Sequence, residues 1–234
     1  LTDYCEKIKP YIQDTGVYLR DAQAAGKKIL FEAQLGSLRD LDYGIHPYTT
    51  SSNPIAAYAP VGSGAPNVKI ENIVGVVKAY SSCVGEGPFT CEMFGEEAEA
   101  LRQAGFEYGA KTGRPRRVGP IDIVATRYGV RCQGATSIAL TKMDVMGYMD
   151  RIPVCAHYRL DGKITDEFPF PALLNDAEPV VEYLDGWKCD ISGVRTWEDL
   201  PVQAQKYVLY LEQAIGCHIG YVSVGPERDS IILR

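Results

Sequence analysis

A run of positive charge occupies the stretch EYGAKTGRPRR, residues 107–117. Four cations stand within seven residues with no acid among them: Lys111, Arg114, Arg116 and Arg117. The planar guanidinium fork of arginine matches the geometry of carboxylate and phosphate groups. A charged run is often only a solvated surface loop, but Pro115 fixes the backbone between two of these arginines. The pattern favours a loop that binds anions.

Two apolar runs end in residues that suit a nucleotide base. The stretch ALTKMD places Lys142 and Asp144 directly after a buried run, and VSVGP places Ser223–Gly225 after another. In open parallel sheets, ligands bind beyond the carboxyl ends of the strands. A carboxylate there can accept hydrogen bonds from the ring N–H and exocyclic amine of guanine. The alternative is that these are ordinary polar strand ends.

A third candidate is the hydroxyl run at residues 49–52, TTSS, whose Thr and Ser side chains could hold a phosphate through neutral donors. Helix capping or a turn is the alternative. The run lies inside residues 36–66, a long stretch rich in Gly, Pro, Ser and Asn, and a loop of this length is usually functional. The chain contains no G-x-x-x-x-G-K-[ST] phosphate loop, G-x-S-x-G elbow or H-E-x-x-H motif.

Composition limits the class of protein. The 234 residues carry a formal net charge of −6, which argues against a general nucleic-acid binder. No apolar run approaches the length of a membrane span, and no signal peptide opens the chain. Seven widely spaced cysteines without a C-x-x-C motif fit thiols in a reducing cytoplasm. Because Leu1 is not an initiator Met, we expect a piece of a longer protein.

Periodicity and turn residues predict the elements that position these side chains. We expect a helix over residues 2–25, broken at Pro10 and Gly16 and stopped by Gly26. Further helices are predicted at 70–82, 96–105, 121–134 and 201–216, and buried strands at 27–33, 136–145 and 219–225. Residues 153–170 predict a β-hairpin that turns at Asp161-Gly162. Alternating strands and helices predict an α/β fold with a largely parallel sheet and a smaller antiparallel element.

Several blocks together resemble one known family, the adenylosuccinate synthetases. The blocks occur in the family's order between Gly26 and Arg234: ILFEAQLGSLRDLDYGIHPYTTSSN, VKAYSSCVGEGPFTCEMF, EYGAKTGRPRRVGPIDIVATRYG, LTKMDV and VSVGPERDSIILR. The resemblance implies a P-loop-NTPase-like α/β fold and a cytoplasmic homodimer of purine biosynthesis. It also implies a ligase that joins IMP and L-aspartate, converts GTP to GDP and phosphate, and requires Mg²⁺. The family phosphorylates the 6-oxygen of IMP and then displaces that phosphate with the aspartate amine.

The resemblance assigns roles to individual positions. Residues 110–116 match the family's aspartate-binding loop: Ala110, Lys111, Thr112, Gly113, Arg114, Pro115 and Arg116. Within it, Arg114 resembles the arginine shared by IMP and aspartate, and Arg116 one that contacts GTP. Thr50 matches the threonine at the IMP phosphate, and Gln34 the glutamine that touches IMP, although ungapped register would place Leu35 there. The GTP-binding positions are matched by Lys142, Met143, Asp144, Ser223, Val224 and Gly225.

The chain also departs from the family pattern. Ala33 replaces a Gly, Lys111 replaces a Thr, and SSNPIAAY replaces a Thr- and Gly-rich continuation. The N-terminal phosphate loop, with the Asp and the following His that serve catalysis and Mg²⁺, has no counterpart here. Because phosphoryl transfer depends on such groups, we expect no catalytic or metal-binding residue in this chain and no activity from it alone.

Two hypotheses follow for the whole chain. The first is the C-terminal part of a single adenylosuccinate synthetase domain. Residues 1–149 would carry the IMP, aspartate and guanine segments, and residues 150–234 the hairpin, the last helix and the closing strand. The second is a non-catalytic guanine-nucleotide-binding module or partner subunit. Neither expects nucleic acid or a membrane as a partner.

Overall fold

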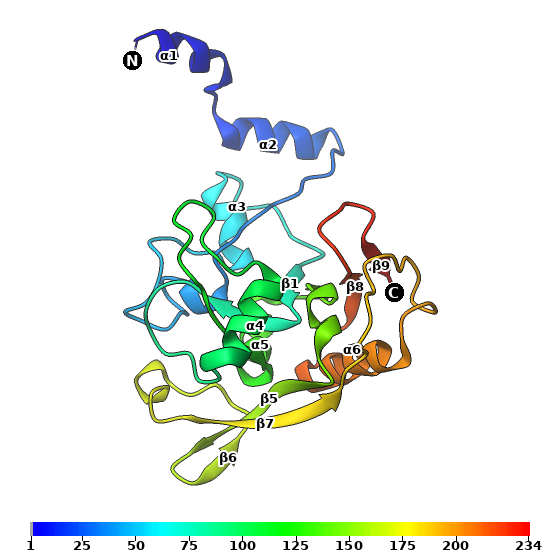
Figure 1. Ribbon diagram of the computed structural model, residues 1–234. Coiled ribbons are helices and arrows are strands. Elements are labelled where there is room, and N and C mark those ends of the chain that lie inside the picture. The colour runs from blue at the N-terminus through cyan, green and yellow to red at the C-terminus, as the bar shows by residue number, and fades with distance from the viewer. Residues whose placement is uncertain (1) are drawn as a thin grey trace.

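The computed structural model describes residues 2–234 as a mixed α/β fold with two sheets (Figure 1). The first sheet has the strand order β1 (Val74–Lys78), β4 (Ser137–Thr141), β8 (Ile219–Ser223) and β9 (Ile231–Leu233). The first three strands run parallel, and β9 is antiparallel to β8. The carboxyl ends of β1, β4 and β8 therefore meet at one edge of this sheet.

The second sheet contains β2 (Tyr80–Cys83), β3 (Arg117–Asp122), β5 (Arg151–Leu160), β6 (Lys163–Thr165) and β7 (Glu178–Asp185). Strand β3 pairs parallel with β5, and the other three pairings are antiparallel. A single residue, Ala79, separates β1 of the first sheet from β2 of the second. The two sheets are therefore joined without a loop.

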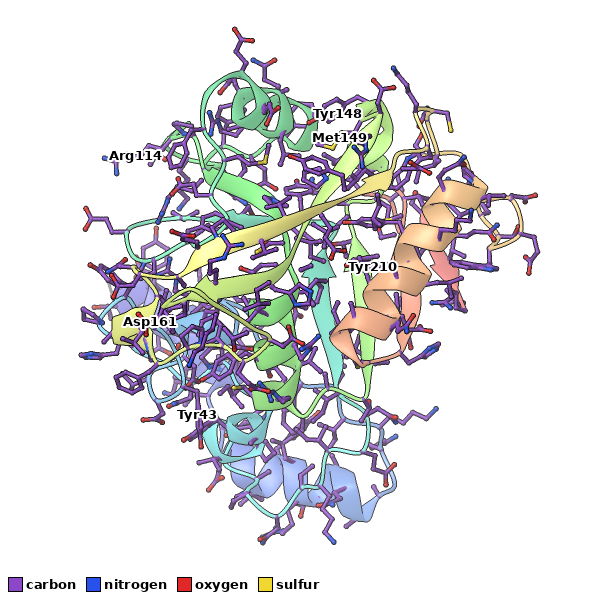
Figure 2. All side chains as sticks on the ribbon, turned by 90° about the horizontal axis from the view of Figure 1, so that it is seen from below. Tyr43, Arg114, Tyr148, Met149, Asp161 and Tyr210 are labelled. Carbon is purple, nitrogen blue, oxygen red and sulfur yellow. The ribbon has the colours of Figure 1, made fainter. Side chains whose placement is uncertain are left out.

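Three longer helices cover the sheets: α4 (Gly95–Gly105), α5 (Ile123–Gln133) and α6 (Val202–Ile215). The side chain of Asp122 caps α5 by accepting a hydrogen bond from the amide of Ala125, and Gly134 ends the helix at φ 62°. Helix α5 contacts both β1 and β5. Helix α6 lies beside β7, where Tyr210 Oη donates to Glu182 Oε2 over 3.0 Å (Figure 2).

The remaining helices are short. They are α1 (Thr2–Ile8), α2 (Thr15–Ala24), α3 (Ala59–Gly62) and five 3₁₀ turns at Lys9–Tyr11, Ser37–Arg39, Ala56–Tyr58, Asp144–Tyr148 and Pro171–Leu173. Helices α1 and α2 bury no residue and project from the body of the molecule (Figure 1). None of the helices in residues 2–234 has the length and apolar character needed to cross a bilayer.

Two predicted elements are wrong. Residues 70–82 form β1 and β2 rather than a helix, and along β1 exposure alternates, with Val74 and Val76 outward. β-Branched residues favour this extended, half-buried geometry. Residues 27–33 form no strand, and Leu30 is 91% exposed. That apolar run has no strand partner within residues 2–234, and a strand needs a neighbour to pair its backbone groups.

Most other predicted elements are confirmed. The helices at 96–105, 121–134 and 201–216, the strands within 136–145 and 219–225 and the hairpin at Asp161-Gly162 all appear. Pro10 interrupts the first predicted helix as expected, but Gly16 lies inside α2. The α/β class is correct. Parallel pairing dominates only the first sheet, since β7 adds a long antiparallel strand that the mixed pattern of residues 177–187 did not predict.

Candidate functional site

The two candidate guanine segments lie side by side. Strands β4 and β8 pair in parallel, with Leu140 opposite Val222, so their carboxyl ends coincide. Beyond them the amide of Met143 donates to the carbonyl oxygen of Ser223 over 3.2 Å. Residues 142–144 and 223–225 therefore form one continuous edge. This is the position at which open parallel sheets bind ligands.

Within this edge, core residues and accessible residues alternate. The side chains of Met143 and Val224 are fully buried, whereas Lys142, Asp144 and Ser223 are half-buried. Lys142 adopts φ 65° in the left-handed region, which turns the chain sharply after β4. Lys142 Nζ donates to the carbonyl of Gly105 and Ser223 Oγ to that of Gly225, so the protein orients two of these polar side chains while the apolar ones fix the backbone beneath them.

The basic loop is a tight hairpin rather than an unstructured segment. The amide of Gly109 donates to the carbonyl of Arg114, that of Gly113 to the carbonyl of Gly109, and that of Arg116 to the carbonyl of Glu107, each over 2.8 Å. Gly113 lies at φ 65°, a conformation that glycine adopts without strain. The exposed Arg114 side chain projects away from the body (Figure 2). Residues 110–113 and Pro115 are exposed as well.

A buried carboxylate lies at the base of this hairpin. Glu107, whose side chain is 2% exposed, accepts hydrogen bonds from Lys78 Nζ (2.7 Å), Tyr80 Oη (2.6 Å) and Arg116 Nη1 (3.1 Å). Burial alone would raise the pKa of Glu107. The hydrogen bonds from Lys78 and Tyr80 and the two positive charges outweigh it, so the pKa is lowered and the group stays ionised.

The same carboxylate raises the pKa of Tyr80, where burial is the largest cause and the hydrogen bond to Glu107 comes next. Lys78, Tyr80 and Glu107 were not predicted as site residues. A single acid just before a run of cations was the one available signal for Glu107. The lysine and tyrosine carried none, because their segment was expected to be helical.

Arg117 has a different environment from Arg116. Its Nε and Nη2 donate to Glu92 Oε2 over 2.9 and 2.5 Å, and Nη1 donates to the carbonyl of Gly87 over 2.7 Å. The hydrogen bond from Arg117 to Glu92 is the largest reason that the pKa of Arg117 is raised. With its guanidinium occupied by protein acceptors, Arg117 serves the structure of the loop at residues 84–87.

Arg39 ties the hydroxyl loop to the same segment, residues 84–87. The amide of Thr50 donates to the carbonyl of Arg39 over 2.8 Å. Arg39 Nη1 donates to the carbonyls of Tyr48 (2.6 Å) and Glu86 (3.2 Å). Arg39 and Arg117 thus both donate to carbonyls of residues 84–87, and this segment links the hydroxyl loop to β3, the strand that follows the basic loop.

Gln34 is not tied to these elements by the contacts that fix the others. It lies exposed in the irregular segment after α2, and Leu35 beside it adopts φ 88° and is 48% exposed. Both remain predictions as contacts of IMP.

Within residues 2–234 one group of three potential metal ligands converges: Cys91, Asp122 and Cys155, all buried. Burial raises the pKa of Asp122, whose Oδ1 caps α5 and whose Oδ2 accepts from Tyr158 Oη over 2.5 Å. The hydrogen bond with Cys155 and burial raise the pKa of Cys91. Two thiols and a carboxylate that already accepts two hydrogen bonds do not fit Mg²⁺, which prefers several oxygen ligands.

A hollow on the described surface borders β9, whose Ile231 pairs with Ser223 of β8. It measures about 690 Å³ and is lined partly by Trp197, His218 and Leu233. Arg234 stacks over Trp197 at 4.3 Å and pairs with Glu212 at 2.9 Å, so the principal charge in the hollow is already satisfied. We therefore assign the site to the polar strand ends and the basic loop.

The fold and the site define a class. The chain is an α/β protein whose candidate ligand groups lie at the carboxyl edge of a parallel sheet. The model of the adenylosuccinate synthetase family matches residues 1–232, and the chain belongs to that family.

Two relatives illustrate the match. The adenylosuccinate synthetase of Caldanaerobacter subterraneus subsp. tengcongensis is 47% identical over 99% of the chain. The solved structure of fully ligated adenylosuccinate synthetase from Plasmodium falciparum has a TM-score of 0.95 and 33% identity, and it covers the whole chain. The chain spans 55% of the length of the first protein and 56% of the second, so about half of each relative lies outside the match.

Proposed function

We propose that this chain is the guanine-reading and aspartate-binding part of an adenylosuccinate synthetase. The complete enzyme would ligate IMP and L-aspartate to adenylosuccinate, with GTP converted to GDP and phosphate, in the synthesis of AMP. One observation carries the proposal: Lys142–Asp144 and Ser223–Gly225 form one edge across β4 and β8. Family membership and the close structural likeness to the fully ligated Plasmodium falciparum relative support it.

In this proposal the residues divide the work. Asp144 accepts the paired donors of guanine, the stem of Lys142 lies along the purine face, and residues 223–225 close over the base. Arg116 contacts GTP, while Arg114 binds IMP and the aspartate carboxylates together with the backbone of residues 110–113. Thr50 and Gln34 contact IMP. Bound Mg²⁺ would neutralise phosphate charge, and its ligands are expected outside this chain because the buried Cys–Asp–Cys group does not fit it.

The proposal extends to the whole polypeptide. In this proposal the complete enzyme is a cytoplasmic homodimer, and the chain forms part of one of its domains. The chain by itself is inactive, because the phosphate loop, its Asp and the following His lie elsewhere in the enzyme.

A second candidate function rests on the same guanine edge across β4 and β8. A non-catalytic guanine-nucleotide-binding module or partner subunit would keep the guanine edge without the phosphoryl-transfer groups. The nucleotide sequence upstream of Leu1 distinguishes the two. A reading frame that continues into a GDEGKGK-like stretch supports the enzyme, and a stop codon followed by a start codon supports the separate module.

The guanine assignment is tested by Asp144→Asn. An amide in place of the carboxylate reverses part of the donor pattern, so preference should move from GDP toward XDP. A bidentate base contact carries about 1–3 kcal/mol in DNA readout, which by analogy predicts about 5- to 150-fold in relative affinity. The measurement is titration calorimetry of the folded chain with each nucleotide.

Asp161→Asn is the matched control. Asp161 is exposed at the tip of the β5–β6 hairpin at φ 50°, a conformation that asparagine also adopts. It should leave the ratio of GDP to XDP affinity unchanged. Absence of GDP binding by the folded wild-type chain, or an unchanged ratio in Asp144→Asn, removes the proposed role.

A further inference from the structure

A continuous line of contacts joins the guanine edge to the basic loop. Lys142 Nζ donates to the carbonyl of Gly105 over 3.1 Å at the carboxyl end of α4. Gly105 packs against Tyr80 so closely that a Cβ there would lie 2.3 Å from Tyr80 Oη. Tyr80 Oη donates to Glu107 over 2.6 Å, and Glu107 accepts from Arg116 Nη1 over 3.1 Å. Each step is a direct contact.

Glu107 is the acidic residue of this line, and it pairs with two cations. An ionised carboxylate at 2% exposure is costly unless donors surround it, and Lys78, Tyr80 and Arg116 supply them. One negative charge between two positive charges leaves the cluster with a net charge of +1. This surplus of positive charge makes the cluster suited to an anion.

Arg116 is held incompletely by the protein. Its Nη1 is bound by Glu107, but its Nε is buried and has no hydrogen-bond partner within residues 2–234. An unsatisfied buried donor costs free energy, so the orientation of this guanidinium is imposed by its surroundings. The Glu107 carboxylate is the acidic partner that imposes it.

We propose that Glu107 is a positioning residue that fixes the Arg116 guanidinium for the phosphates of the bound nucleotide. Through Tyr80 and Gly105 it ties that guanidinium to the lysine of the guanine edge. Glu107 therefore determines how much of the nucleotide affinity comes from the phosphates rather than from the base. This inference rests on the proposed function, because it takes a guanine nucleotide as the ligand.

The test compares GTP with guanosine, which has the same base and no phosphate. In Glu107→Gln the side chain keeps its size but loses its charge, so Arg116 loses its ionic partner. Hydrogen bonds to charged groups are the stronger ones, and we expect GTP to bind about tenfold more weakly while guanosine changes by less than about twofold. Titration calorimetry on the folded chain gives both affinities.

Glu92→Gln is the matched control. It removes the carboxylate partner of Arg117, the next residue in sequence, from a pair of the same type. Because the other bonds of Arg117 go to backbone carbonyls, this variant should leave the ratio of GTP to guanosine affinity unchanged. Equal changes in that ratio in both variants, or an unchanged ratio in Glu107→Gln, would overturn the inference.

Amide hydrogen exchange supplies a readout that needs no ligand. In Glu107→Gln the amides of Gly109, Gly113 and Arg116 should lose protection by about tenfold, because the base of the hairpin is released, while α6 is unchanged. Unchanged protection in the hairpin overturns the inference. If the wild-type chain binds neither GTP nor guanosine, the proposed function fails, and the exchange result still decides the role of Glu107.

Tyr80→Phe is the second variant if Glu107→Gln does not fold. It keeps the carboxylate and both cations but deletes the hydroxyl between Gly105 and Glu107. We expect GTP to bind about threefold more weakly than to wild type. This loss is smaller than that of Glu107→Gln, since a neutral hydrogen bond contributes less than a charged one. A folded Tyr80→Phe with an unchanged ratio of GTP to guanosine affinity and unchanged hairpin protection would contradict the proposal.

Discussion

Arg116 and Arg117 are neighbours with opposite assignments. The guanidinium of Arg117 donates hydrogen bonds to Glu92 and to backbone carbonyls. Arg116 has one carboxylate contact and a buried, unpaired Nε within the described residues 2–234. The chain therefore distinguishes two arginines by the acceptors that surround them. Sequence alone identified the cluster of cations, but only the contacts show that Arg117 is fully held by protein acceptors while Arg116 is not.

Gly105 offers a prediction at the scale of one residue. In Gly105→Ala the new methyl group would lie 2.3 Å from Tyr80 Oη and 3.2 Å from Glu107 Cγ. Overpacking of this kind costs about 1–3 kcal/mol, and we expect the free energy of unfolding in urea to fall by about 2 kcal/mol.

Gly62→Ala is the control for this experiment. Gly62 ends α3, its φ is not positive, and an added Cβ would meet nothing within 4 Å among the described residues. Alanine there should be neutral or stabilise by about 0.4–1 kcal/mol, because it restricts the unfolded chain. A Gly105→Ala protein as stable as Gly62→Ala would show that Tyr80 is not confined as the structure has it.

The sequence contained little information about Glu107. Glutamate is rarely buried, and nothing in its neighbours indicates that Lys78, 29 positions earlier, would meet it. By contrast, the position of Lys142 and Asp144 at a strand end could be predicted, because they directly follow an apolar run. Sites made by one strand end are visible in sequence, and sites made by distant segments depend on folding.

At the scale of elements, Asp122 supports α5 and the second sheet together. Its Oδ1 accepts from Ala125 and its Oδ2 from Tyr158. Asp122→Ala removes the cap and leaves a buried hydroxyl unsatisfied, so we expect a loss of about 3 kcal/mol in the free energy of unfolding. Asp122→Asn keeps an acceptor for the cap and removes a buried charge, so the loss should stay below about 1 kcal/mol.

The difference in stability between wild type and Asp122→Asn should depend on pH with a definite sign. Burial raises the pKa of Asp122 in the folded chain, so the ionised form is less favourable there than in the unfolded chain. The stability of wild type should therefore fall relative to Asp122→Asn as the pH rises above about 4, the unfolded value. Urea unfolding of both proteins at several pH values measures it, and the opposite slope would contradict the assigned pKa direction.

The two wrong elements have physical causes. The apolar residues of 70–82 suit one face of a helix as well as a strand, and the turn at Ala79 has no glycine or proline to mark it. Residues 27–33 carry a strand-like composition, but their state depends on a partner, which composition does not supply. Helices α4 and α6 were predictable because their periodicity is local, although Phe106 rather than a glycine caps the end of α4.

At the scale of the molecule, the first two helices contribute little to the body. Helices α1 and α2 bury no residue. Contact with the body is limited to features such as the 3.0 Å hydrogen bond from Thr15 Oγ1 to the carbonyl of Ser63. Deletion of residues 1–25 should change the free energy of unfolding by less than about 1 kcal/mol, measured by urea denaturation.

Asp14→Ala provides the companion measurement. Asp14 caps α2 by accepting from the amide of Val17 over 3.0 Å, yet that helix buries none of its residues. Loss of this cap should reduce local helicity without moving the global urea midpoint, unlike loss of the Asp122 cap. A large shift of the midpoint in either the deletion or Asp14→Ala would show that the two helices belong to the cooperative unit.

The single residue between the two sheets has an evolutionary consequence. Lys78 and Tyr80 flank Ala79, stand in different sheets and bind the same carboxylate. Successive strand residues face opposite sides, so one inserted or deleted residue at this joint would turn the lysine or the tyrosine away from Glu107. Length variation should therefore be rejected at residues 78–80 and accepted in exposed turns such as Asp161-Gly162. In a library of single-residue insertions and deletions selected for folding, variants changed at residues 78–80 should be absent, whereas variants changed at Asp161-Gly162 should be present.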